Sequence, residues 1–289
     1  MAQSFTATTD GALADAPKVR RRVLVTGAAG NIGSYFAEHS HHRYALRLLV
    51  RESDKNSDAI KKFGELVVGD ITNLDRMKEV CQGIDTVLHL AGDPSPNATW
   101  ESVIGANITG TYYTFVAAKA ANCRRVIYAS SIHAVSGYPS DVQVKTSEPV
   151  NPGDLYGVSK CFGESLGRYM AEQEGLSVIA IRIGAFQPPE KMQRPEGLSL
   201  VDCWISPRDL NQLFDRCITA THIRFAIVHG LSDNTFNHLD LSDARELLGY
   251  QPQDDAMKLL PQLAQIEIRE KLMGHNMGDA WAKSGLRDS

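Results

Sequence analysis

The stretch RVLVTGAAGNIGS, residues 22–34, decides the fold, because an apolar run leads into three glycines spaced three residues apart. Glycine at these positions lets a strand turn sharply into a helix and lets the backbone approach a pyrophosphate. The N-terminus of the following helix would offer unpaired N–H groups to the phosphates. We therefore predict a dinucleotide site here, although an ordinary strand-to-helix turn would also use glycine. The residues predicted to form it are Gly27, Gly30, Asn31, Ile32 and Gly33.

After this turn, short apolar runs alternate with helical patterns, and this alternation is typical of a parallel sheet covered by helices on both faces. A long helix is predicted over residues 99–122. The expected fold class is α/β, a Rossmann-type doubly wound parallel sheet with a small C-terminal substrate lobe. The predicted strands of the sheet are residues 22–27, 45–50, 65–70, 85–92, 124–131 and 177–184.

Three parts are predicted along the chain. Residues 1–20 form a polar, flexible extension, residues 21–184 the dinucleotide-binding core, and residues 185–289 a small substrate-binding lobe with C-terminal helices. The lobe opens with AFQPPEKMQRPEG, residues 185–197, whose prolines and charges predict a loop or flap. Two further helices and a strand are then predicted, at residues 206–220, 241–250 and 224–230 respectively.

Composition and charge limit the partners of this chain. Its 289 residues carry a formal net charge of −4 with both signs scattered, so no nucleic-acid partner is expected. Five cysteines without a C-x-x-C pair indicate reduced thiols in a cytoplasmic protein. No apolar run reaches the length of a membrane span, and the start has no hydrophobic signal core, so no membrane association is expected.

A histidine cluster, His39, His41 and His42, invites a metal-binding interpretation. These residues fall at the end of a predicted helix, with no carboxylate or cysteine partner at ligand spacing. A solvated helix end is the preferred interpretation, and no metal site is predicted.

The choice between NAD and NADP depends on the end of the second strand, LRLLVRESD, residues 46–54. A carboxylate there would bind the ribose 2′-hydroxyl, whereas an arginine would accommodate a 2′-phosphate. The strand is expected to end at Val50, and Arg51 favours NADP because a guanidinium can hold a phosphate through two hydrogen bonds. Glu52 keeps NAD open, and both charged residues would also suit a solvated loop.

A tyrosine and a lysine four residues apart stand in DLYGVSKCFGES, residues 154–165. On a helix, Tyr156 and Lys160 share one face. An ammonium beside a phenol stabilises the phenolate and lowers the pKa of the phenol, which makes a tyrosine a usable general base.

Taken with the glycine turn, these residues resemble the short-chain dehydrogenase/reductase superfamily, and more closely its extended branch, the NAD-dependent epimerase/dehydratase family. The resemblance covers roughly residues 22–184 and, more loosely, the remainder. It implies that GD after the third strand holds adenine and that HLAG after the fourth strand lies along the cofactor. The cofactor residues it implies are Asp70, Ile71, Leu90, Ala91, Gly92, Asn107, Tyr156 and Lys160, and the catalytic ones are Ser131, Tyr156, Lys160 and Asn107.

The implied roles have structural alternatives. Asp70 could cap a turn, Asn107 could satisfy the backbone of a kinked helix, and Ser131 could bond to its own strand. In the family-based interpretation, Lys160 also bonds the nicotinamide ribose and Asn107 supports a proton relay through water.

A narrower resemblance, to uronate dehydrogenases and related aldose 1-dehydrogenases, rests on ASSIHAVSGYP, LYGVSKCFGE, IRIG and the tryptophan of VDCWISPRDL. It implies that the substrate contacts are Ser95, Ser131, His133 and Arg194, with the arginine gripping a sugar carboxylate. Ile132 stands where that group has an asparagine, and Ala185 where it has a serine. These two departures remove polar groups from the sugar pocket and leave a different sugar or acid open as the ligand.

The implied function is NAD(P)-dependent oxidation of the C1 hydroxyl of a small free sugar or sugar acid to the lactone, with tyrosine as the general base. The short chain after residue 184 favours a small substrate over a sugar nucleotide. The alternatives are a sugar or sugar-nucleotide epimerase or dehydratase of the same family, and an NADP-binding sensor without chemistry. The resemblance also implies a homo-oligomer.

Overall fold

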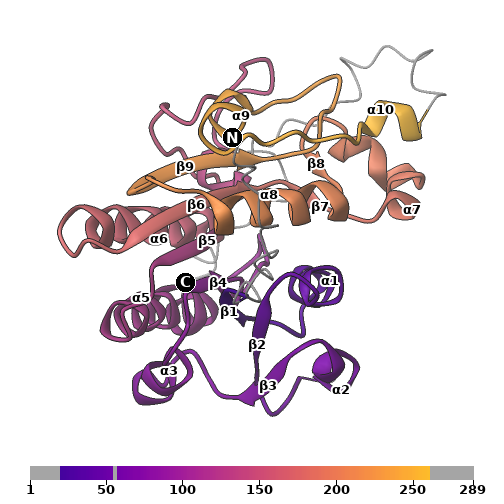
Figure 1. Cartoon of the computed structure of the whole chain (residues 1–289). Helices are drawn as coiled ribbons and strands as arrows, with labels where there is room; N and C mark the ends of the chain where they lie inside the picture. The colour runs from indigo at the N-terminus through magenta and orange to yellow at the C-terminus, as the bar shows by residue number, and fades with distance from the viewer. Residues whose placement is uncertain (1–19, 55–56, 261–289) are drawn as a thin grey trace, which may run out of the picture.

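Seven parallel strands form one sheet in the order β3-β2-β1-β4-β5-β6-β9 (Figure 1). The computed structural model describes residues 20–54 and 57–260. The order reverses direction at β1 and β4, and in such sheets ligands bind outside the carboxyl ends of the strands at this point. The bounds of the strands are β1 Arg22–Thr26, β2 Ala45–Val50, β3 Glu65–Val68, β4 Thr86–His89, β5 Arg125–Ser131, β6 Ser177–Ile183 and β9 Phe225–Gly230.

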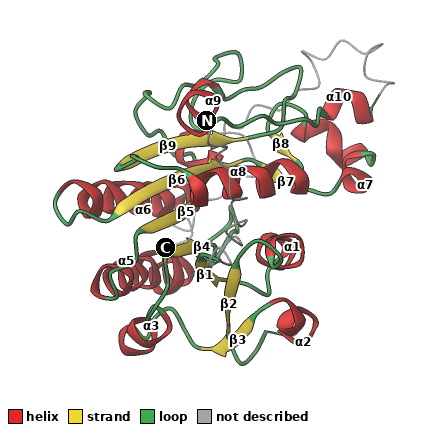
Figure 2. Ribbon diagram, in the orientation of Figure 1, coloured by secondary structure: helices red, strands yellow, loops and turns green. Residues whose placement is uncertain are grey.

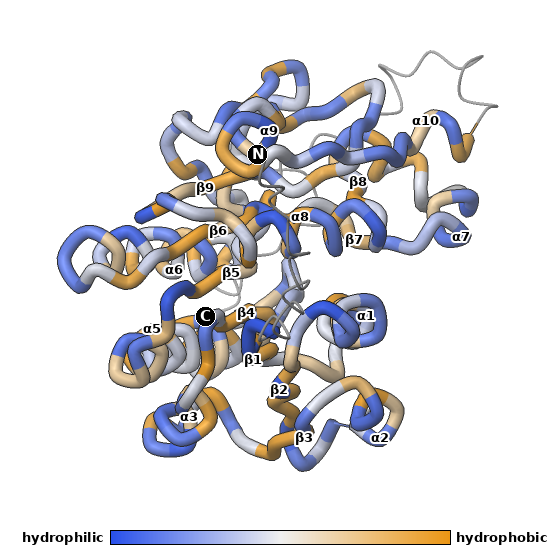
Figure 3. The backbone as a smooth tube through the Cα atoms, viewed as in Figure 1, coloured by the Kyte–Doolittle hydropathy of each residue, from blue (hydrophilic) through white to orange (hydrophobic). Residues whose placement is uncertain are grey.

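Helices cover both faces of the sheet (Figure 2). Apolar side chains of α1, α8 and α9 pack on one face, and those of α3, α5 and α6 pack on the other. Because both faces are covered, strands such as β2 and β6 are almost continuously apolar and are orange in Figure 3. The bounds of the longer helices are α1 Asn31–Ser40, α3 Leu74–Val80, α5 Thr111–Ala120, α6 Leu155–Glu172, α8 Pro207–Thr219 and α9 Ser242–Leu248.

Short helical turns occupy several of the connections between these elements. The short turns are α2 Ser57–Ile60, η1 Lys61–Phe63, α4 Trp100–Val103, η3 Ile132–Val135, α7 Pro189–Met192, η4 Pro195–Leu200 and α10 Ala256–Leu259.

The predicted doubly wound parallel sheet is confirmed, and its predicted strands are found within a few residues of their expected bounds.

The long helix predicted over residues 99–122 is not a uniform α-helix. A π-helical segment, η2, spans Ile104–Gly110 between α4 and α5. Asn107 in its middle is buried, and its side chain hydrogen bonds the backbone of Asp93 in the loop after β4. Wider turns of this kind are frequent at functional sites, and here the turn brings an amide to the end of the sheet.

The segment 185–197, predicted as a loop or flap, contains regular structure. Ala185–Phe186 forms β7, which pairs in parallel with β8, Trp204–Ile205, and α7 follows two residues later. The pairing of β7 with β8 joins the segment to the chain that leads into α8. The sequence pattern missed it because two-residue strands carry no detectable alternation.

The division of the chain at residue 184 stays a prediction. The strand that follows it, β9, belongs to the main sheet and pairs with β6 along its length. The helix α8 likewise packs on the main sheet through Leu213 and Phe214. The predicted N-terminal extension lies almost entirely outside the described residues, as does the chain beyond residue 260.

Other features expected from the sequence can be located. All five cysteines lie in the described part of the chain and are free thiols. Within residues 20–54 and 57–260, His, Cys, Asp and Glu side chains form no group that could hold a metal ion. Over the same described residues, no helix combines the length and apolar character needed to cross a bilayer.

Candidate active site

The glycine turn after β1 forms a cradle that side chains would fill. Gly27 has a positive φ of 67°, and a Cβ added there would lie 2.9 Å from the backbone nitrogen of Ala91. A Cβ on Gly33 would lie 2.5 Å from the carbonyl oxygen of Gly27. Gly30 caps α1 without any side-chain hydrogen bond, so the first N–H groups of the helix are left for a ligand. These features fit the pyrophosphate of a dinucleotide.

A groove of about 1020 Å³ runs from this turn along the carboxyl ends of the neighbouring strands. Its position at the reversal of strand order is the one expected for a dinucleotide. Eleven residues predicted from the sequence to bind the cofactor line it: Gly27, Gly30, Asn31, Ile32, Gly33, Arg51, Asp70, Ile71, Leu90, Ala91 and Gly92. The structure therefore brings these eleven residues together, whereas the other three predicted cofactor residues, Asn107, Tyr156 and Lys160, do not line the groove. The binding roles of all of them stay predictions.

Two acidic residues, Asp54 and Asp70, line the groove after the ends of β2 and β3. Asp70 accepts hydrogen bonds from the backbone and hydroxyl of Thr72, and these bonds lower its pKa. Asp54 accepts hydrogen bonds from the backbone nitrogen of Arg51 at 2.8 Å and from its guanidinium at 3.1 Å. The sequence analysis considered Glu52 as the carboxylate that follows β2 and missed Asp54, which lies in the turn after β2 and lines the groove.

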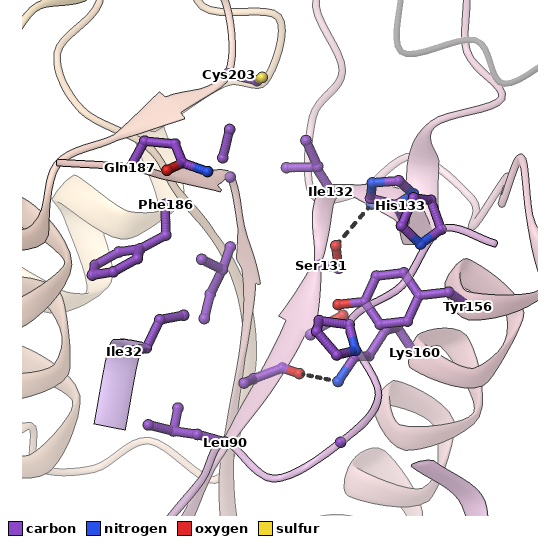
Figure 4. Close-up of a pocket in the computed structure, with 18 of the residues that line it drawn as sticks. Ile32, Leu90, Ser131, Ile132, His133, Tyr156, Lys160, Phe186, Gln187 and Cys203 are labelled. Atoms are coloured by element: carbon purple, nitrogen blue, oxygen red, sulfur yellow. Dashed lines mark hydrogen bonds between the residues drawn. The ribbon is translucent and has the colours of Figure 1, made fainter. Parts of the chain in front are cut away.

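A second cavity, of about 440 Å³, adjoins the groove and contains three of the four predicted catalytic side chains, those of Ser131, Tyr156 and Lys160. Ser131, His133, Tyr156 and Lys160 all line it, and Figure 4 shows Tyr156 and Lys160 pointing from α6 toward the end of β5. The two spaces share part of their lining. The lining residues they share include Ile32, Leu90, Gly92, Ala129 and Phe186.

Tyr156 and Lys160 are both buried at the base of this cavity. The Nζ atom of Lys160 donates a hydrogen bond of 2.9 Å to the carbonyl oxygen of Ala129 and lies 5.4 Å from the centre of the Tyr156 ring. Burial raises the pKa of Tyr156 to about 12, although the hydrogen bond from Ser131 acts to lower it. Burial lowers the pKa of Lys160 to about 8. The lowered tyrosine pKa expected from the lysine is therefore not found, because desolvation of the phenolate dominates.

The small residues between Tyr156 and Lys160 allow close packing. A Cβ on Gly157 would lie 2.2 Å from the carbonyl oxygen of His133, so only glycine lets the first turn of α6 approach η3. The hydroxyl of Ser159 accepts a hydrogen bond of 2.9 Å from Nδ2 of Asn107. Asn107 does not line either cavity; it joins the π-helical segment to α6 beside Lys160.

Asp154 is a site residue that the sequence analysis missed. It caps the N-terminus of α6 by accepting a hydrogen bond of 2.6 Å from the backbone nitrogen of Gly157. Its second carboxylate oxygen lies 2.6 Å from Nδ1 of His133. An aspartate just before a helical run is a standard N-cap signal, but nothing in the sequence indicates the contact with His133.

Two predicted substrate contacts are absent from the lining of the cavity. Arg194 is exposed in a turn, where its backbone bonds Lys191 and Gly197, and it does not line the cavity. The hydroxyl of Ser95 accepts a hydrogen bond from the backbone of Asn97, and Ser95 is absent from the lining too. The two substituted positions, Ile132 and Ala185, do line it. The polar lining residues that sequence analysis missed are Asp93, Ser130, Gln187 and Ser199.

Comparison with known proteins agrees with this arrangement. Residues 23–205 match the NAD dependent epimerase/dehydratase family. The chain is 36% identical over 252 residues to an NAD-dependent glucose-6-phosphate dehydrogenase of Haloferax volcanii, covering 81% of this chain and 94% of the relative. An L-arabinose 1-dehydrogenase (NAD(P)(+)) of the same organism is 34% identical over 254 residues, covering 81% of this chain and 97% of the relative.

The fold has a similar counterpart among solved structures. The crystal structure of uronate dehydrogenase from Agrobacterium tumefaciens superposes with a TM-score of 0.73 and 30% identity, covering 86% of this chain and 90% of that one. The resemblance inferred from the glycine turn and the Tyr156–Lys160 pair is thus confirmed. The chain belongs to the NAD dependent epimerase/dehydratase family.

Proposed function

We propose that this protein is a dehydrogenase that oxidises the C1 hydroxyl of a small free sugar or sugar acid to the lactone, using NAD or NADP. The observation that carries the proposal is that the cofactor groove adjoins the cavity that holds Ser131, Tyr156 and Lys160. The sugar dehydrogenases among the relatives support the same class of reaction.

In this mechanism Tyr156 is the general base that takes the proton from the C1 hydroxyl. The hydroxyl of Ser131 holds the same oxygen and stabilises the charge that develops on it. When bound, NAD or NADP supplies the acceptor for the hydride that leaves C1. Lys160 is buried beside the ring of Tyr156 and would hold the nicotinamide ribose through its ammonium.

The substrate end of the cavity suits a sugar whose contacts are partly apolar. Ile132, Ala185 and Phe186 line it beside the polar side chains of His133 and Gln187 (Figure 4). The relatives act, by their names, on a phosphorylated hexose, a neutral pentose and a uronate, so the family accommodates sugars with different groups.

The NADP preference favoured by Arg51, a cytoplasmic location and self-association stay predictions.

The test is the formation of reduced nicotinamide, followed by its ultraviolet absorbance, with purified protein and a panel of aldoses, sugar phosphates and uronic acids. We expect turnover with at least one free sugar and accumulation of the lactone or its hydrolysed acid. Tyr156→Phe should abolish turnover while cofactor binding is retained. Tyr169→Phe, which alters an exposed tyrosine on the same helix, is the matched control and should leave the rate unchanged.

Two outcomes would contradict the proposal. Sugar isomerisation without accumulation of reduced cofactor would indicate an epimerase, because that reaction returns the hydride to the substrate. Cofactor binding without turnover of any sugar would indicate the non-catalytic sensor.

A further inference from the structure

One buried carboxylate serves both the helix that carries Tyr156 and the histidine that lines the cavity. The side chain of Asp154 is 1% exposed. Its Oδ1 accepts a hydrogen bond of 2.6 Å from the backbone nitrogen of Gly157, and its Oδ2 lies 2.6 Å from Nδ1 of His133. The start of α6 and the ring of His133 are therefore held by the same group.

The contact fixes which ring nitrogen carries the proton. A carboxylate can only accept a hydrogen bond, so Nδ1 of His133 is the donor to Asp154. In the neutral imidazole the other nitrogen, Nε2, is then an acceptor. The orientation of the ring follows from the same contact.

The remaining surroundings of His133 hold it in one place. Its backbone nitrogen donates a hydrogen bond of 3.2 Å to the hydroxyl of Ser131. Its ring meets the ring of Tyr156 at 65°, with 5.3 Å between the centres. The side chain of His133 is 22% exposed and lines the cavity, whereas its carboxylate partner is not accessible. His133 thus lies beside the proposed base and lines the same cavity.

We infer that Asp154 is a positioning residue that presents Nε2 of His133 to the cavity as the acceptor for a hydroxyl of the substrate. The inference rests on the proposed function and specifies the chemistry of one contact. A sugar hydroxyl can donate a hydrogen bond to Nε2 of His133. An ionised carboxylate or phosphate oxygen is itself an acceptor and cannot make this bond. The sugar position that contacts His133 therefore carries a hydroxyl.

The substitution Asp154→Asn separates the charge from the helix cap. Asparagine is as good an N-cap as aspartate, and its Oδ1 can still accept from Gly157. That orientation turns the amide NH₂ toward His133, so Nδ1 must lose its proton and Nε2 must gain one. The group that faces the substrate changes from an acceptor to a donor.

We expect Asp154→Asn to raise KM for the sugar by about tenfold, with the dissociation constant of NAD unchanged. The matched control is Asp255→Asn, another buried aspartate that caps a helix, α10, and does not line the cavity. Asp154→Ser also caps α6 but is too short to reach the ring, and it should raise KM as well. It serves as the second variant if Asp154→Asn does not fold.

The ring tautomer supplies a readout that does not need turnover. Long-range 1H–15N correlation spectra should show His133 protonated at Nδ1 in the wild-type protein and at Nε2 in Asp154→Asn, with His133→Gln identifying the signals. A double-mutant cycle then asks whether Asp154 acts through the histidine. In a His133→Ala background, adding Asp154→Asn should not change KM for the sugar any further.

The outcomes separate this inference from the proposed function. A wild-type protein that oxidises sugars, together with an Asp154→Asn variant of unchanged KM and unchanged tautomer, overturns the role of Asp154 and leaves the proposed function intact. A wild-type protein that oxidises no sugar overturns the proposed function and, with it, the substrate contact.

Discussion

Nδ2 of Asn107 donates a hydrogen bond of 2.9 Å to the hydroxyl of Ser159, the residue before Lys160. The same amide donates to the carbonyl oxygen of Asp93 at 3.0 Å, and its Oδ1 accepts from the backbone nitrogen of Asp93 at 2.7 Å. One buried side chain thus joins the π-helical segment, the loop after β4 and α6. Its partners lie in that loop and on α6, whereas the structural alternative named from the sequence was the backbone of its own kinked helix.

Asn107→Ala should lower both stability and turnover. It leaves the Asp93 backbone and the Ser159 hydroxyl without their partner, and each unsatisfied buried group costs about 1–3 kcal/mol. We expect the free energy of unfolding in urea to fall by at least that amount and kcat to fall with it. Asn73→Ala, which removes the exposed cap of α3, is the control for a lost asparagine hydrogen bond. Wild-type kcat in a destabilised Asn107→Ala would show that the amide has no influence on the site.

Lys160→Met should stabilise the protein at neutral pH while abolishing turnover. Burial lowers the lysine pKa from 10.5 to about 8, so the charged form is disfavoured in the folded state by about 3 kcal/mol. Because Ala129 loses its hydrogen-bond donor in the variant, we expect a gain of about 1–3 kcal/mol in the free energy of unfolding at pH 7.

The pH dependence of stability tests the sign of this effect. Below pH about 8 the lysine is charged in both states and the cost of burying it is fully present. Between pH about 8 and 10.5 the unfolded chain binds more protons than the folded one, so this cost is relieved and stability rises. Urea unfolding across this interval should show the rise in the wild type and in the exposed control Lys61→Met, and lose it in Lys160→Met. Identical profiles in all three proteins would contradict the buried charge.

Asp54→Ala should shift cofactor preference toward NADP. The side chain of Arg51 is 68% exposed, and its guanidinium pairs with Asp54 at 3.1 Å. Removing the carboxylate frees the guanidinium for the 2′-phosphate of NADP and removes a negative charge that would repel that phosphate. In Asp54→Ala we expect the dissociation constant of NADP to fall about tenfold relative to that of NAD. In Arg51→Ala we expect it to rise relative to that of NAD. Equilibrium titration of both cofactors measures it. Arg208→Ala, an arginine paired outside the groove, should leave the ratio unchanged, and equal ratios in all variants would contradict the prediction.

Glu164→Leu should be strongly destabilising, and Arg182→Met should reverse most of the loss. The two side chains form two hydrogen bonds of 2.9 Å in the interior, and Glu164 also accepts one of 2.6 Å from Ser130. Removing one partner leaves the other charge buried, which costs about 3–5 kcal/mol, whereas replacing both by apolar groups is often nearly neutral.

Urea unfolding of the two single variants and the double variant measures this coupling. The control is the exposed pair of Glu172 and Arg224, where Glu172→Leu should change stability by about 1 kcal/mol or less. A double variant as unstable as Glu164→Leu alone would show that packing, not charge, dominates at this position.

The strands and the glycine turn were predictable because their signals are local. The apolar runs at β2 and β6 and the spacing of Gly27, Gly30 and Gly33 lie within a few residues, where backbone geometry alone relates sequence to structure. The same holds for Tyr156 and Lys160, whose spacing places both on one helix face. These short-range relations were enough for the fold class, the cofactor groove and the family.

The contacts that shape the substrate end depend on packing between distant segments. Asp154 meets His133 across 21 positions of sequence, and Asn107 meets Ser159 across 52. Arg194, which the resemblance to uronate dehydrogenases implied as a substrate contact, lies exposed in a turn. Local spacing does not specify which loops and helix ends approach one another, because that approach follows from how the sheet, η3 and α6 pack. The tertiary structure alone therefore decided which ring nitrogen of His133 donates to Asp154, and that the first turn of α6 needs a glycine at position 157 to approach η3.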